Sequence, residues 1–221
     1  MNALSGSAVK PSVPVRPVQV FIVSGNVLLR QGLKELCESH GLEVTGEGTS
    51  AREARRLISA LKPAVAVIED ILQDGTGIAV SRDVQDRVPS VHCLLLTGWD
   101  QQKAERAAVL AGAAGYVFKQ AGDAAALVGA IRTAASGHPL LAPDARRRAA
   151  TGLLALSEAP WLRAAPQERE VLALMSQGLT NEQIALDSRL TAAQVSDVVS
   201  SVLLKLGIGT GVGSAVGNAE T

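Results

Sequence analysis

The chain has 221 residues, of which 47% are hydrophobic, and a formal net charge of zero at pH 7. This length and apolar content are enough for one large or two small buried cores, which excludes a chain that is disordered over most of its length. With no net charge, no global field draws the protein to nucleic acid or to an anionic membrane, so charge has to be analysed locally.

The two cysteines and the hydropathy pattern exclude further classes. Cys37 and Cys93 lie in a helical and a strand pattern, with no CxxC and no His cluster nearby, so we expect buried, reduced thiols. No stretch approaches the roughly 20 apolar residues of a membrane span, and residues 1–17 lack the apolar segment of a signal peptide. We expect a soluble cytoplasmic protein with no membrane partner, in which residues 1–17 form a flexible tail.

Strand and helix patterns alternate over residues 18–138, which we expect to form one domain. Each strand is a short apolar run, and each helix has apolar residues at helical spacing. The expected strands are 18–23, 42–44, 65–68, 92–96 and 115–118, and the expected helices are 27–40, a segment from Ser50 to just before Pro63, 78–88, 101–111 and 123–136. This alternation predicts an α/β domain with a five-stranded, parallel, doubly wound sheet of flavodoxin-like type.

The central strand ends in two adjacent carboxylates, Glu69 and Asp70. Open α/β sheets bind ligands at the carboxyl ends of their strands, so this position is a candidate site. Side chains along a strand alternate between faces, so we expect Glu69 to share a pocket with Thr97 and Lys119, and Asp70 to point away from it.

The C-terminal part has a different character. Residues 139–165 contain several prolines and an arginine run at 146–148, which indicates a linker with one helix around 144–154. Residues 166–207 predict three short helices that begin at Pro166, Thr180 and Thr191, the layout of a helix-turn-helix. Five glycines between 207 and 217 disfavour another helix, and we expect residues 208–221 to form a flexible, Gly-rich tail.

Residues 18–141 resemble the receiver domain of bacterial response regulators. The resemblance rests on the spacing from Glu69 to the DGTG segment at 74–77, on Thr97 at a strand end and on Lys119 after a final strand; Tyr116 lies at the position of the family's aromatic switch residue. It implies a domain that phosphorylates itself on an Asp, with the help of an acidic pair that holds Mg²⁺, a Thr or Ser, and a Lys.

This sequence departs from the receiver pattern at the phosphorylation site. Glu69 stands at the phosphoacceptor position, and Ser24 and Gly25 replace the acidic pair. Without those carboxylates we expect neither Mg²⁺ binding nor phosphoryl transfer, and we predict no catalytic residue, no metal, no cofactor and no enzymatic activity. Glu69 either imitates a phosphorylated Asp by reaching toward Lys119 or forms an ordinary ion pair that holds the fold.

The segment from Gln167 to Ile208 resembles the LuxR/NarL-type DNA-binding domain, so the whole chain resembles a NarL/LuxR-type response regulator. In that family the recognition helix presents lysines, an Asn and an Arg to DNA. The corresponding DNA-binding candidates here are weaker: Gln194, Ser196, Asp197, Ser201 and Lys205, with Ala193 at a further contact position. Residues 151–221 hold four basic and seven acidic side chains, a net charge of −3 that opposes binding to phosphates.

Two hypotheses follow. The first, which we favour, is an atypical response-regulator transcription factor that works without phosphorylation and binds DNA weakly or with assistance, as a homodimer or as a heterodimer with a related regulator. The alternative is a protein-interaction module that does not bind DNA and modulates a related regulator. Either could sense a ligand in the unmetallated pocket beside Thr97 and Trp99.

Overall fold

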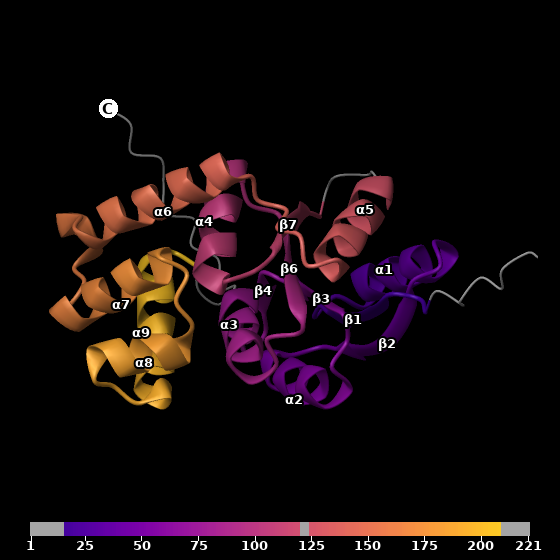
Figure 1. Cartoon of the computed structure of the whole chain (residues 1–221), viewed down its shortest axis with the longest axis horizontal. Coiled ribbons are helices and arrows are strands. Elements are labelled where there is room, and N and C mark those ends of the chain that lie inside the picture. Colours follow the sequence, from indigo (N-terminus) through magenta and orange to yellow (C-terminus); the bar gives the residue numbers. More distant parts are fainter. Residues whose placement is uncertain (1–15, 120–123, 209–221) are drawn as a thin grey trace, which may run out of the picture.

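The computed structural model describes residues 16–119 and 124–208, which form an α/β part and a helical part joined side by side (Figure 1). The main sheet contains β1 (Gln19–Val23), β2 (Glu43–Gly48), β3 (Val65–Glu69), β6 (His92–Thr97) and β7 (Gly115–Phe118), and a small hairpin contains β4 (Ile71–Leu72) and β5 (Gly75–Thr76). The helices of the α/β part are α1 (Val27–Ser39), α2 (Ala51–Leu61), α3 (Gly77–Arg87), α4 (Gln101–Ala111) and α5 (Ala124–Ala135).

The main sheet confirms the predicted flavodoxin-like fold. Its strands are parallel and lie in the order β2-β1-β3-β6-β7, with β3 in the centre. Residues of β1 alternate between the two faces: Val20 and Ile22 pack with α1 and α5, while Phe21 and Val23 pack with residues of α2, α3 and α4. This alternation is the period of two that a strand covered on both faces requires.

The second strand is longer than predicted. The sequence analysis placed it at 42–44, but β2 runs from Glu43 to Gly48. Gly46 lies inside this strand, where the ring of Phe21 occupies the space that a side chain would fill; a Cβ at Gly46 would lie 2.7 Å from that ring. A glycine within a strand here marks close packing rather than a chain reversal.

The helical part contains α6 (Pro143–Ser157), the short helix η1 (Pro160–Leu162), α7 (Pro166–Ser176), α8 (Asn181–Ser188) and α9 (Ala192–Lys205). The helix-turn-helix layout is confirmed, and α8 and α9 begin with the capping boxes Thr180–Gln183 and Thr191–Gln194. The linker helix α6 packs against α4 (Figure 1) and buries Leu153. Within the described residues, no helix is long and apolar enough to cross a membrane.

Both predicted tails fall mostly on residues that the structure does not describe. Ile208, however, was assigned to the Gly-rich tail and is instead buried, with 4% of its surface exposed. Its backbone N–H donates to the Leu203 carbonyl at 2.8 Å, so the folded part extends at least to residue 208. Cys37 and Cys93 are free and buried, as predicted.

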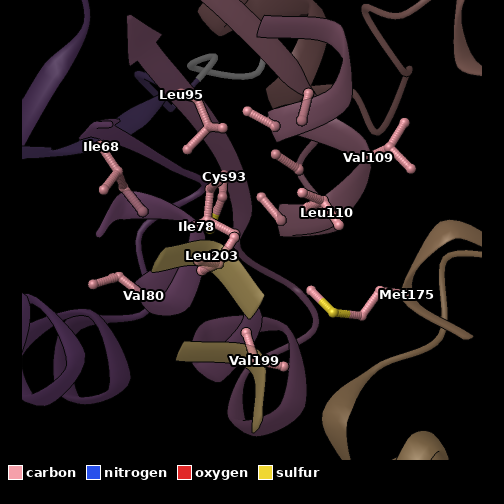
Figure 2. Packing of buried hydrophobic residues seen from close by; sticks show 14 of the residues in the cluster. Ile68, Ile78, Val80, Cys93, Leu95, Val109, Leu110, Met175, Val199 and Leu203 are labelled. Carbon is pink, nitrogen blue, oxygen red and sulfur yellow. The ribbon is translucent and has the colours of Figure 1, made fainter. Parts of the chain in front are cut away.

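One apolar cluster, the shared core, runs through both parts of the molecule. It contains Ile78 of α3 and Leu95 of β6 together with Met175 of α7 and Val199 and Leu203 of α9. Figure 2 shows these side chains converging from the α/β ribbon and from the gold ribbon of α9. The helix-turn-helix is therefore packed on the α/β part and shares its hydrophobic core.

A buried arginine holds this joint. Arg82 of α3 is 3% exposed. Its guanidinium donates three hydrogen bonds of 2.7 Å, to the carbonyl of Leu110 in α4, to the carbonyl of Leu179 and to Oδ1 of Asn181 at the start of α8. Burial lowers the pKa of Arg82 to about 10, although Asp86 and Asp83 oppose the change, so the group is charged at neutral pH. Asp86 also accepts a hydrogen bond from the Glu182 N–H in the first turn of α8.

A second polar cluster holds α7 against α9. Glu168 is buried and accepts hydrogen bonds from Ser201 Oγ at 2.6 Å, from the Ala165 N–H at 2.6 Å and from Lys205 Nζ. Burial alone would raise the pKa of Glu168, but the hydrogen bonds from Lys205, Ser201 and Ala165 lower it to about 2. The carboxylate thus fixes the C-terminal half of α9 to the start of α7.

We expect Arg82→Met to weaken the joint between the two parts. The variant leaves three buried oxygens without a donor and should lower the free energy of unfolding by about 3 kcal/mol. Hydrogen exchange followed by mass spectrometry should show faster exchange at the start of α8. Arg87→Met, an exposed arginine at the end of the same helix, is the control. Equal exchange in the two variants would contradict this role.

We expect Glu168→Gln to destabilise the protein at neutral pH by about 2 kcal/mol. Because the pKa of Glu168 is depressed in the folded state, its stabilisation is present above pH 4.5 and is lost as the pH falls toward 2. Denaturant titrations should therefore show a gap between wild type and variant that closes over this range. Glu170→Gln, exposed on the same helix, should show no such gap.

Candidate functional site

The receiver pocket lies at the carboxyl ends of four neighbouring strands. Ser24 follows β1, Glu69 ends β3, Thr97 ends β6 and Lys119 follows β7. Parallel strands present these ends at one edge of the sheet, where doubly wound folds bind their ligands. The sequence analysis expected Glu69, Thr97 and Lys119 to share a pocket, and these three residues lie at one edge of the sheet together with Ser24.

Lys119 is shared by two carboxylates. Its Nζ lies 2.8 Å from Glu69 Oε1 and 2.7 Å from Asp70 Oδ1. Partial burial would lower the pKa of Lys119, but hydrogen bonds and charge from Asp70 and Glu69 outweigh burial and raise it. The ammonium is thus held charged between two acidic side chains.

The prediction that Asp70 points away from the pocket is wrong. Asp70 is 2% exposed, and its Oδ2 accepts from Thr97 Oγ1 at 2.9 Å, while its Oδ1 accepts from Lys119 and from the Ile71 N–H. The regular strand ends at Glu69, and Asp70 already lies in the bend that leads into the β4–β5 hairpin. Strict alternation therefore does not extend to this residue.

Glu69 connects β3 to the segment after β1. Its Oε2 accepts from Ser24 Oγ at 2.6 Å and from the Gly25 N–H at 3.2 Å, while Oε1 contacts Lys119. Both carboxylate oxygens are used within the protein. Both interpretations of Glu69 require the contact with Lys119, and the bonds from Ser24 and Gly25 also tie its carboxylate to the segment after β1.

The residues of this pocket do not fit a Mg²⁺ ion. A magnesium site needs carboxylate oxygens that can face the ion, and here the oxygens of Glu69 and Asp70 are taken by Lys119, Thr97, Ser24 and backbone N–H groups. Ser24 offers only a hydroxyl as a ligand, and Gly25 has no side chain. Within the described residues, no group of three or more His, Cys, Asp or Glu side chains could hold a metal ion.

The DGTG segment has a structural role in this pocket. Asp74 accepts hydrogen bonds from the N–H groups of Ala51 at 2.6 Å and Arg52 at 3.1 Å, so it caps the start of α2. Gly77 starts α3 directly against β3, and a Cβ there would lie 2.4 Å from the Glu69 carbonyl oxygen. Only glycine allows this approach.

Two aromatic residues lie near the pocket. Tyr116 is partly buried and packs edge-on against Phe118, with ring centroids 5.3 Å apart. Burial, and secondarily the charge of Glu105, raises the pKa of its hydroxyl. Trp99 donates its backbone N–H to Thr97 Oγ1 at 3.0 Å, and its ring lies under Lys103 Nζ at 4.7 Å.

Most DNA-binding candidates on α9 are bound within their own domain. Gln194 accepts from Thr191 in the capping box, and Ser201 and Lys205 both donate to Glu168. Ser196 is partly buried, and Asp197 is exposed. The helix therefore presents a carboxylate to solvent, while its last cation is held by an acidic partner.

The C-terminal half of α9 also faces the α/β part. A cavity of about 250 Å³ separates Ser200, Leu203 and Leu204 of α9 from a wall that includes Arg55 and Thr76. Leu203 is buried in the shared core, and Leu204 is 59% exposed. In this arrangement a DNA groove could reach only part of the helix.

The sequence analysis did not predict the contacts of three residues. It placed Asp70 on the wrong face of the sheet, and it assigned no partner to Arg82 or Glu168. A weak signal for Arg82 exists, because it follows Ile78 by four residues and so lies on the buried face of α3. Its partner residues lie about 30 and 100 positions away in the sequence, which no local pattern reveals.

Comparison with known families agrees with this architecture. Residues 20–132 match the model of the response regulator receiver domain, and residues 165–216 match the model of bacterial regulatory proteins of the luxR family. The first match covers the sheet and the receiver pocket, and the second covers α7, α8 and α9.

Individual relatives extend over most of the chain. The DNA-binding transcriptional activator DevR/DosR of Mycobacterium tuberculosis is 38% identical over 198 residues, covering 86% of this chain and 89% of the relative. The response regulator protein VraR of Staphylococcus aureus is 26% identical over 192 residues, covering 86% and 91%.

Solved structures show the same fold. A LuxR-family two-component response regulator from Aurantimonas sp. SI85-9A1 is 28% identical, with a TM-score of 0.54 over 62% of this chain and 97% of the other. The response regulator ChrA, from a heme-sensing two-component system, is 25% identical, with a TM-score of 0.50 over 87% and 92%. With a receiver domain followed by a luxR-type helix-turn-helix, the chain belongs to the NarL/LuxR-type response regulators, a family of transcriptional regulators.

Proposed function

We propose that this response regulator is a cytoplasmic transcription factor that works without phosphorylation and has no catalytic activity of its own. The observation that supports this most is the pairing of Lys119 with two carboxylates of the protein itself, Glu69 and Asp70. In a phosphorylated receiver, as the family resemblance implies, that ammonium would be needed by the phosphoryl oxygens. Here an internal ion pair takes its place.

Asp70 is the one acidic residue of the pocket that could replace the missing acceptor. Its carboxylate is 2% exposed and bonded on both oxygens, so a phosphodonor would have to displace Thr97 and Lys119 to reach it. No carboxylate stands at Ser24 or Gly25 to hold the metal that shields charge during transfer. Both attack by Asp70 on a phosphodonor and binding of the metal are therefore disfavoured.

We further propose that DNA binding is weak or needs a partner subunit. Non-specific affinity for DNA comes mainly from cations that neutralise phosphates. The single cation on α9, Lys205, is paired with Glu168, and Asp197 is exposed on the same helix. A dimer, either with itself or with a related regulator, would double the few contacts that one chain can make.

The alternative function is a protein-interaction module without DNA binding. Its specific support is the packing of α9 on the α/β part, which leaves Leu203 in the shared core and the C-terminal half of α9 facing Arg55 and Thr76. Access of a DNA groove to the whole of α9 would require this joint to open at Arg82. If the joint does not open, a partner protein can bind only to the surface of the closed molecule.

We expect treatment with acetyl phosphate and Mg²⁺ to leave the wild-type protein unmodified in intact-mass spectrometry. The variant Ser24→Asp/Gly25→Asp/Glu69→Asp should restore a phosphoryl adduct, because it rebuilds the acidic pair and the acceptor. A Cβ at Gly25 would have the Thr49 carbonyl oxygen, at 3.9 Å, as its nearest neighbour, so the new side chain has room.

The matched control is Ser24→Asp/Gly25→Asp/Glu69→Asn, which has the metal carboxylates but no acceptor and should show no adduct. An adduct on the wild type that disappears in Asp70→Asn would overturn the proposal, since it would identify Asp70 as a working acceptor.

We expect the wild type to bind a duplex from its own upstream region weakly, with a shallow dependence of log K on log salt. Ser196→Lys/Asp197→Asn adds two charges to α9 and should add about one to two phosphate contacts, which steepens the slope by about 0.9 for each. Fluorescence anisotropy at several salt concentrations measures both quantities. Glu38→Lys, on α1, makes the same change in charge away from α9 and should leave the slope unchanged.

Nanomolar, site-specific binding by the wild type at physiological salt would contradict the weak-contact proposal. No binding by the wild type together with binding by Arg82→Met would show that the closed joint blocks DNA. No binding by any of these variants would favour the interaction module.

A further inference from the structure

We propose that a cavity where the receiver, the linker and the helix-turn-helix meet binds a small organic anion with an apolar body. This three-way cavity has a volume of about 300 Å³ and lies between α4, α6, η1 and the end of α9. Ligand cavities in proteins start at about this size. It is separate from the receiver pocket, whose side chains do not line it.

One side of the three-way cavity is apolar. Leu153 and Leu156 of α6, Trp161 of η1, and Leu206 and Ile208 at the end of α9 line it. Trp161 is 63% exposed although it is the largest of these side chains. An exposed tryptophan beside a cavity offers apolar and aromatic surface that a ligand can cover.

The opposite side is cationic. Lys103 and Arg106 lie three residues apart on α4, and both line the cavity. Arg106 Nε is buried and has no hydrogen-bond partner within residues 16–119 and 124–208. Arg106 as a whole is only partly buried, so an anionic ligand in the cavity can bond the accessible part of its guanidinium and offset the cost of the unsatisfied donor.

The linker helix leaves room for this guanidinium. Gly152 of α6 faces Arg106, and a Cβ at that position would lie 3.3 Å from both Arg106 Nε and Nη2. Asp100 also lines the cavity, but its Oδ1 accepts from the Lys103 N–H at 2.9 Å as the cap of α4. Two cations against one capping carboxylate favour a ligand with a negative charge.

Because of the position of the cavity, binding of a ligand there affects how the three parts of the chain are arranged. Its walls come from all three parts of the chain, so a ligand that contacts them stabilises the arrangement in which they meet. A carboxylate at Arg106 with an apolar body against Trp161 and Ile208 would connect α4 to the end of α9. This inference does not rest on the proposed function, because occupancy can be measured in a chain that never binds DNA.

The test uses 4-phenylbutyrate as the probe and 4-phenylbutanol as its uncharged counterpart. The two tryptophans of the chain report on the site, since Trp161 lines it and Trp99 packs against Lys103, which also lines it. Titration of the full chain should give a saturable change in tryptophan fluorescence with the carboxylate. The alcohol should bind at least about tenfold more weakly, because it cannot form a charge-assisted hydrogen bond with Arg106.

Two variants of the cavity and one control variant separate this site from unspecific binding. Arg106→Gln should weaken the carboxylate at least about tenfold and leave the alcohol unchanged, whereas Arg148→Gln, an exposed arginine on α6, should change neither. Leu156→Trp should fill the cavity and abolish binding of both compounds, measured by calorimetry; circular dichroism and Tm confirm that each variant is folded. If Arg106→Gln does not fold, Leu156→Trp decides.

Three results would overturn the inference. They are the absence of saturable binding by 4-phenylbutyrate, equal affinity for the acid and the alcohol, and unchanged affinity in both Arg106→Gln and Leu156→Trp. None of them depends on DNA, so failure here leaves the proposed function standing, and failure of DNA binding leaves this site standing.

Discussion

A buried guanidinium without a carboxylate partner is the constraint on which the arrangement of this molecule depends. Arg82 gives up hydration to bond three neutral oxygens, one on α4 and two at the start of α8. Such burial is favourable only while all three oxygens stay in place, because an uncompensated buried charge costs several kcal/mol. The shared core and the three-way cavity both include residues of the helix-turn-helix part, so their present form requires that this joint is closed. The position of the helix-turn-helix is thus set by a few polar contacts together with apolar packing.

The receiver pocket is balanced without any external group. Lys119 lies between Glu69 and Asp70, and Thr97 and Ser24 satisfy the remaining carboxylate oxygens. A ligand entering this pocket would have to break interactions that the protein already makes. The three-way cavity differs from this pocket, because a buried donor of Arg106 in its lining lacks an acceptor among the described residues.

The sequence predicted the order and type of the main elements because apolar periodicity and capping residues are local properties. The parallel sheet, the three C-terminal helices and the two capping boxes at Thr180 and Thr191 all follow from such patterns. Local pattern failed where the chain bends or where distant segments meet. Asp70 was placed on the wrong face because the regular strand ends at Glu69, one residue before it. The linker was predicted as a segment with one helix, and the pattern did not reveal that Leu153 and Leu162 belong to the core. The contacts of Arg82 and Glu168 depend on tertiary packing alone.

The shared core bears on what can be learned from fragments of this chain. Leu203 and Ile208 lie in the same apolar cluster as Ile78 of the α/β part and Leu153 of the linker. A fragment that begins near residue 160 would expose these side chains to water, and an isolated receiver would expose the facing surface of α3 and α4. Exposed apolar surfaces of this kind promote self-association. Dimers found with either fragment would then report on the cut surface, and the oligomeric state of this protein has to be measured on the intact chain.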